Sequence, residues 1–196
     1  MTARLRAGLA VATMAAAALL ACRDPNAPEA IYSNYADTLE LYALNGSPRG
    51  APSAVRLIAG VGGSSAVTAD EFFFFDVAVD IDAEGRPVLY PVRTVAAPFL
   101  GRHRVGFQRS DQGFDAITEA PTENYTHDSL RVVNIGEVTL IETADPDACT
   151  TFFGRGVIYG KIVVDSIRTS TRRLFVRLAA NPNCGFRSFQ PGVPTR

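Results

Sequence analysis

The sequence lacks tryptophan and is poor in several residues that perform chemistry. It contains two histidines, three cysteines and a single lysine, Lys161, among 196 residues. Neither histidine, His103 or His127, has a cysteine, histidine or aspartate partner at metal-ligand spacing. No Gly-x-Ser-x-Gly motif is present for a serine hydrolase, although a triad can also assemble from distant residues. Motifs therefore identify no catalytic residue, no cofactor site and no metal site.

Charge and long apolar runs are limited too. The chain carries 19 basic and 20 acidic residues, a net charge of −1, which gives no electrostatic case for binding nucleic acid. The absence of tryptophan and of paired aromatic girdles argues against a transmembrane barrel. The one long apolar run, residues 7–20, is shorter than the roughly 20 residues that a spanning helix needs.

That run has the layout of a secretory signal peptide, with Arg4 and Arg6 before it and small residues after it. Its exit reads Leu19-Leu20-Ala21-Cys22, which resembles the lipobox of bacterial lipoproteins. The resemblance implies that residues 1–21 are removed and that Cys22, now the first residue, is thioether-linked to diacylglycerol. Two or more acyl chains on Cys22 would give stable membrane anchoring. The alternative is an ordinary signal peptide followed by a chance cysteine.

The resemblance also implies a location. Arg23 is not the aspartate associated with inner-membrane retention, so the outer membrane, on its periplasmic side, is favoured. Residues 22–30 then form a short polar tether with two prolines, and residues 31–196 form one globular domain. Losing Arg4 and Arg6 shifts the net charge to −3.

Two cysteines remain in the domain, Cys149 and Cys184. An even pair in an exported chain predicts a disulfide. The alternative, a redox or metal pair, lacks the usual two-residue spacing.

The segment 71–95 predicts the central hairpin. Phe73, Phe75, Val77, Val79 and Ile81 alternate with polar residues, which is typical of a strand with one buried face. We expect the aspartates at 76, 80 and 82 to point away from the core, and Phe72 and Phe74 to be buried on the second face. A turn at residues 82–85 and a returning strand over residues 88–95 complete the hairpin.

The whole sequence predicts about ten short strands and no helix of normal length. Two of these strands, residues 157–167 and 173–180, form a second hairpin. This pattern predicts an all-β fold: a single-domain β-sandwich or a small soluble β-barrel.

Two clusters of charged residues are candidate ligand sites. Asp80, Asp82 and Glu84 before Gly85 match the first half of a calcium loop, but the twelfth position is Pro91 instead of glutamate. Residues 102–104 (Arg-His-Arg) form a basic cluster that could meet an anionic lipid or glycan, or simply be solvated.

These observations favour a lipid-anchored binding or structural module of the cell envelope, with an envelope protein or glycan as possible partner. The alternatives are a small-molecule or glycan-binding lipoprotein with its site in a barrel mouth, and an envelope hydrolase.

Overall fold

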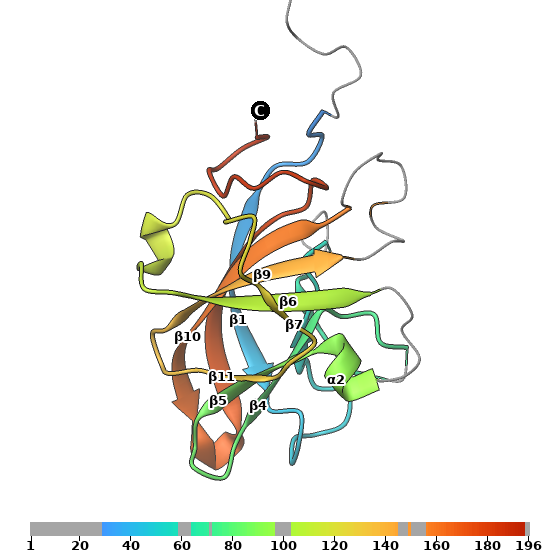
Figure 1. The fold of residues 1–196 in the computed structure, drawn as a ribbon. Helices are drawn as coiled ribbons and strands as arrows, with labels where there is room; N and C mark the ends of the chain where they lie inside the picture. Colours follow the sequence, from blue (N-terminus) through green and yellow to red (C-terminus); the bar gives the residue numbers. More distant parts are fainter. Residues whose placement is uncertain are drawn as a thin grey trace, which may run out of the picture.

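The protein folds as an open, sandwich-like pair of antiparallel sheets (Figure 1). The computed structural model describes residues 29–58, 64–70, 72–96, 103–144, 149 and 156–194. The predicted signal peptide and Cys22 lie outside these residues. The predicted all-β class is confirmed, and of its two forms the structure is the sandwich, because each sheet ends in edge strands.

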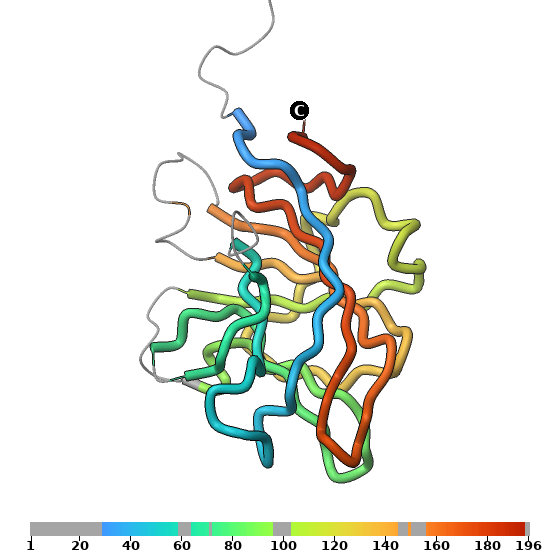
Figure 2. The backbone as a smooth tube through the Cα atoms, turned by 180° about the vertical axis from the view of Figure 1, so that it is seen from behind, coloured from blue at the N-terminus to red at the C-terminus, as the bar shows by residue number. Residues whose placement is uncertain are grey.

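The larger sheet has six strands. Across the sheet their order is β1 (Tyr35–Tyr42), β11 (Arg173–Asn181), β10 (Ile158–Arg168), β9 (Val138–Ala144), β6 (Arg104–Ser110) and β7 (Thr126–His127). The predicted hairpin is the β10–β11 pair, closed by a 3-10 turn, η2 (Thr169–Thr171). β1 is the edge strand of this sheet and runs antiparallel beside β11, as the view from behind shows (Figure 2).

The smaller sheet has five strands. Their order is β3 (Ala66–Val67), β2 (Ala54–Val55), β4 (Val77–Ile81), β5 (Pro87–Pro91) and β8 (Arg131–Val132). The central β4–β5 hairpin turns through residues 82–85, as predicted, and Gly85 supplies the positive φ of 80° that this turn needs.

The returning strand is shorter than predicted. It ends at Pro91, and residues Val92–Ala96 form the short helix α2. Proline has no N–H to continue a ladder, and the hydroxyl of Thr94 donates to the Pro91 carbonyl, which supports the helical turn.

The core lies between the sheets. Its largest fully buried side chains come from both: Leu41, Leu57, Phe75, Leu89, Ile141, Ile158, Ile162, Leu174 and Leu178. Phe75 is therefore a core residue, as the alternation predicted.

The prediction for the other face of the phenylalanine strand is wrong. Phe72 and Phe74 are exposed, and the strand starts only at Val77. Asp76 and Asp80, expected in solvent, are buried. Buried carboxylates are tolerated where other groups satisfy them, and both have such partners.

The outer face of the larger sheet carries the only lysine. Residues Phe114–Ala116 form a 3-10 helix, η1, over this face. The Nζ of Lys161 donates to the carbonyls of Phe114 and Ile117 at 2.6 and 2.7 Å. These two bonds hold residues 114–117 against the sheet. Burial lowers the pKa of Lys161.

The chain enters and leaves the domain at one end, opposite the β4–β5 turn (Figure 1). Within the described residues, none of the helices has the length and apolar character to cross a membrane.

Candidate functional site

The most distinctive exposed feature is a pair of phenylalanines ahead of β4. The side chains of Phe72 and Phe74 are each 65% exposed, and their rings stack with centroids 6.5 Å apart. The guanidinium of Arg56, just after β2, lies 5.6 Å from the centre of the Phe74 ring. Large exposed aromatic groups and arginine are the residues that binding surfaces favour.

The backbone is bent to display this pair. Phe73 has a φ of 53°, an uncommon conformation for a bulky residue. Asp70 stabilises the bend, because its carboxylate accepts from the N–H of Phe72 and its carbonyl accepts from the N–H of Phe73. The bend sends Phe73 toward the core, where its ring meets that of Phe75, and leaves Phe72 and Phe74 outside. Backbone strain of this kind often occurs in residues that belong to functional sites.

A groove adjoins the pair. It has a volume of about 450 Å³, and Phe72 forms part of its wall. The other walls are the loop 43–53 and residues 68–70, which present Arg49, Ser53 and Asp70 among their polar groups. The groove therefore joins apolar and polar surface directly beside the exposed rings.

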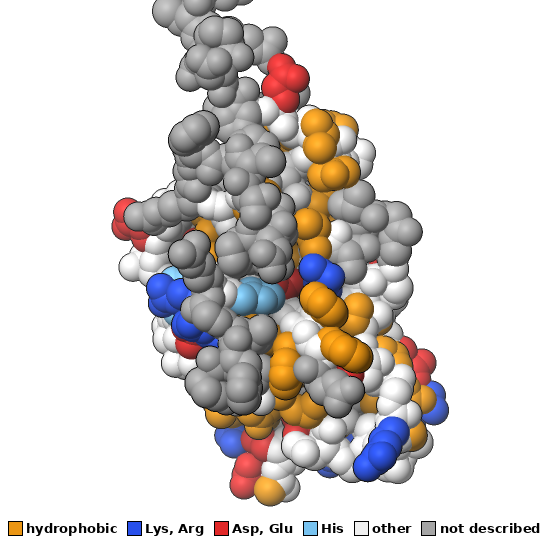
Figure 3. All heavy atoms as spheres, turned by 90° about the vertical axis from the view of Figure 1, so that its right-hand side faces the viewer, with side chains coloured by type: hydrophobic (Ala, Val, Ile, Leu, Met, Phe, Trp, Pro, Cys, Tyr) orange, Lys and Arg blue, Asp and Glu red, His pale blue; other side chains and the backbone are white. Residues whose placement is uncertain are grey.

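One residue beyond Phe75, Asp76 ties the two sheets together. Its Oδ2 accepts from the backbone N–H of Leu57 at 2.7 Å, and its Oδ1 accepts from the Thr143 hydroxyl at 2.7 Å. The Nε2 of His103 lies 2.8 Å from the same Oδ1 and 3.1 Å from the Thr143 oxygen. Histidine side chains reach the surface on this side of the molecule, beside hydrophobic ones (Figure 3).

These three side chains are an acid, a histidine and a hydroxyl, the same residue types as in a hydrolytic triad. In a triad the acid and the nucleophile use different ring nitrogens. Here Asp76 and Thr143 contact the same nitrogen, and the Thr143 proton goes to Asp76. Because a carboxylate only accepts, Nε2 of His103 must carry a proton. The arrangement suits a polar tie between sheets, not nucleophilic attack by Thr143.

The second histidine forms a pair on the outer face of the larger sheet. The Nε2 of His127 lies 3.1 Å from the carboxylate of Glu142, across the intervening strand β6. Gly106 of β6 lies between them, and its lack of a side chain leaves the space that the histidine ring occupies.

The carboxylates of the hairpin turn have partners within the protein. Arg172 and Asn45 bind Asp80, and Arg86 contacts both Asp82 and Glu84. In the part of the chain that the structure describes, no cluster of three or more histidine, cysteine or acidic side chains could hold a metal.

The remaining predicted residues are placed as follows. Cys149 and Cys184 form the predicted disulfide. Of the basic cluster, Arg102 lies outside the described residues, Arg104 contacts Asp128, and His103 faces Asp76.

Comparison of the chain with protein-family models, with curated proteins and with solved structures finds no match.

The exposure of Phe72 and Phe74 was not predicted from the sequence, because four consecutive phenylalanines are also compatible with a buried strand. One signal could have found it: Asp70 is a turn-forming residue two positions before Phe72.

Proposed function

We propose that the chain is a lipid-anchored binding module of the bacterial cell envelope, which holds a partner protein through Phe72 and Phe74. The observation behind this proposal is the exposed, stacked aromatic pair with Arg56 over one ring. Removing two such rings from water supplies the apolar part of a binding energy, and aromatic and arginine side chains commonly dominate protein interfaces.

The local structure supports a role for the pair in binding. A solvent-facing phenylalanine contributes little to folding, yet Asp70 uses two acceptor atoms to hold the bend at Phe73. The pair also stands on a rigid base, because Phe75 and Asp76, which follow it directly, are both buried. A surface that is ordered in advance loses less entropy when a partner binds.

The groove beside Phe72 favours a second candidate, a glycan or small molecule. Its volume of about 450 Å³ lies in the range of ligand sites, and its walls offer both a ring and polar groups. Its open form gives little of the enclosure that such ligands usually have, so the protein partner is the first choice.

Photo-crosslinking in intact cells tests the binding surface. A photoreactive phenylalanine analogue replaces Phe72 or Phe74, and a matched control carries it at Leu130, which is 52% exposed elsewhere. We expect a discrete protein adduct at positions 72 and 74, absent at 130, that weakens when Arg56→Glu is added. Adducts to glycan alone would favour the second candidate, and equal labelling at all three positions would contradict both.

The anchor is tested separately. Cys22→Ser should leave an unlipidated, unprocessed precursor that keeps residues 1–21. A Cys22→Ser protein that is processed at the same position as the wild type would refute the lipid anchor.

A further inference from the structure

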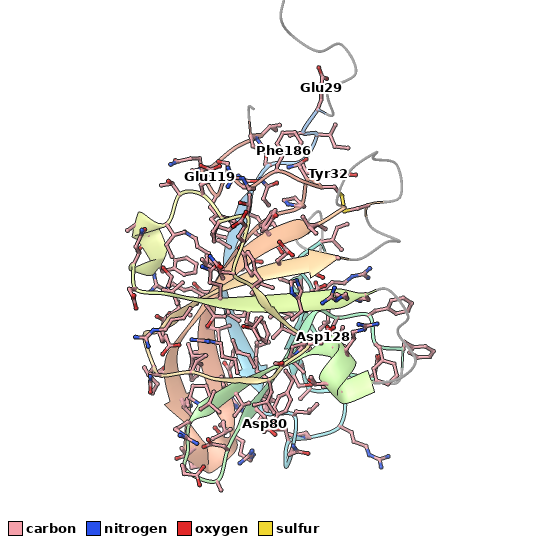
Figure 4. The ribbon with its side chains drawn as sticks, viewed as in Figure 1. Glu29, Tyr32, Asp80, Glu119, Asp128 and Phe186 are labelled. Carbon is pink, nitrogen blue, oxygen red and sulfur yellow. A yellow bond between two sulfur atoms is a disulfide. The ribbon has the colours of Figure 1, made fainter. Side chains whose placement is uncertain are left out.

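The domain end at which the chain enters carries a small apolar group. Ile31, Tyr32 and Val193 are 70, 40 and 50% exposed, respectively. Figure 4 places Tyr32 at this end with Glu29, and Asp80 at the opposite end. The three side chains come from the two ends of the chain, so their proximity depends on how those ends are held.

Two sets of contacts fix them. Asn34 and Gly192 form an antiparallel bridge, which lays the residues before Asn34 alongside those after Gly192. Asn183 then binds the N-terminal segment, accepting from the N–H groups of Ile31 and Tyr32 at 2.9 Å each and donating to the Tyr32 carbonyl at 2.8 Å.

Asn183 is itself held firmly. It is buried, it bonds to Asn181, and it precedes Cys184 of the disulfide. The first described residues are therefore fastened to the folded domain, and the direction in which the chain arrives is set by the fold.

We propose that this end, defined by Ile31, Tyr32 and Val193, lies on the lipid surface and fixes the orientation of the domain on its membrane. The inference rests on the lipid anchor of the proposed function. Residues 22–28 can span at most about 25 Å, so an anchor at Cys22 keeps this end near the bilayer. Tyrosine and aliphatic side chains are suited to the boundary between headgroups and acyl chains.

The orientation has a consequence for the aromatic pair. Phe72 and Phe74 precede β4 of the smaller sheet and are not among the three residues that define the entry end. With the entry end on the lipid, the pair remains available to a partner in the periplasm.

The absence of tryptophan makes a direct test possible. Two full-length, lipidated variants each receive one tryptophan, Tyr32→Trp at the proposed membrane face and Glu84→Trp at the exposed turn of the opposite end. Each is reconstituted into phosphatidylethanolamine and phosphatidylglycerol vesicles that contain lipids brominated near the headgroup. We expect loss of emission and a blue shift for the tryptophan at position 32, and neither for that at position 84.

A third variant combines Tyr32→Trp with Ile31→Asp and Val193→Asp. It should still float with the vesicles through its anchor but lose most of the quenching. Flotation without selective quenching at position 32 would overturn the orientation and leave the anchor standing. Failure of the lipidated protein to float would overturn the anchor and this inference with it.

Discussion

Asp76 and His103 meet at 2.8 Å between the two sheets, although they are 27 residues apart in the chain. Asp76 is only 2% exposed and also binds the Thr143 hydroxyl and the Leu57 N–H. One carboxylate therefore joins the residues just after β2 and just before β6 to strand β9, at the side of the core next to the aromatic pair.

Replacing Asp76 by alanine should be costly, because three polar groups lose their partner in a buried place. We expect Asp76→Ala to lower the free energy of unfolding by about 3–5 kcal/mol, as for other broken buried pairs. Chemical denaturation measures this. Asp111→Ala, on a side chain 90% exposed, is the control and should change stability by less than about 0.5 kcal/mol. Similar costs for the two variants would show that the tie contributes nothing.

This tie also shows where sequence reasoning stops. The hairpins β4–β5 and β10–β11 and the pairing of Cys149 with Cys184 follow from local alternation, turn residues and cysteine count. The burial of Asp76 depends on Thr143, which is 67 residues away, so no local period could reveal it. Alternation at Asp76 instead predicted a side chain that points away from the core.

The aromatic pair was missed for a related reason. A period of two places Phe72 and Phe74 on a common side, which is correct, but it cannot say that the side faces water. The bend at Phe73 decides this, and a positive φ in phenylalanine is rarely expected from sequence.

Gly106 is expected to be intolerant of a side chain. A Cβ there would lie 2.9 Å from the ring of His127 and from the Cβ of Tyr125. Gly106→Ala should therefore displace His127 from Glu142 and cost about 1–3 kcal/mol of stability. Gly113→Ala is the matched control, because a Cβ at Gly113 meets nothing within 4 Å. If both alanine variants unfold at the same denaturant concentration, Gly106 does not lie as close to His127 and Tyr125 as the structure places it.

Glu137 should contribute pH-dependent stability. Burial raises its pKa, but hydrogen bonds from Arg131 and Asn134 outweigh this and hold the pKa below its ordinary value of 4.5. A depressed carboxyl pKa stabilises the fold above the unfolded value, and the contribution is lost as the pH falls through the folded value. The stability difference between wild type and Glu137→Gln should thus be positive near neutral pH and shrink below 4.5.

Denaturation at several pH values measures this difference. In an Arg131→Ala background the glutamine substitution should have a much smaller effect, since the main partner is gone. A difference that stays constant down to acid pH would contradict the assignment.

The disulfide should be detectable directly and should stabilise the domain. Its cysteines are 35 residues apart, which corresponds to about 3–4 kcal/mol in the chain-entropy model. Mass spectrometry of non-reduced protein should show the linked Cys149–Cys184 peptide, and the double alanine variant should lose stability by that amount. Reductant should weaken the wild type but not the variant. Free alkylation of both cysteines without reductant would disprove the bond.

The turn at Asp80, Asp82 and Glu84 should not respond to calcium. Arg172 and Asn45 already bind Asp80, and Arg86 lies 2.8 Å from Asp82 and 3.3 Å from Glu84, so bound calcium would have to displace these partners. Thermal melts in about 5 mM calcium, above the ~0.1–1 mM range of weak extracellular sites, should overlay those in chelator. A rise in melting temperature with calcium that Asp82→Ala removes would instead identify the turn as a metal site. Asp82→Ala should lower stability equally in both conditions, because the carboxylate accepts from the N–H groups of Glu84 and Arg86 with or without the ion.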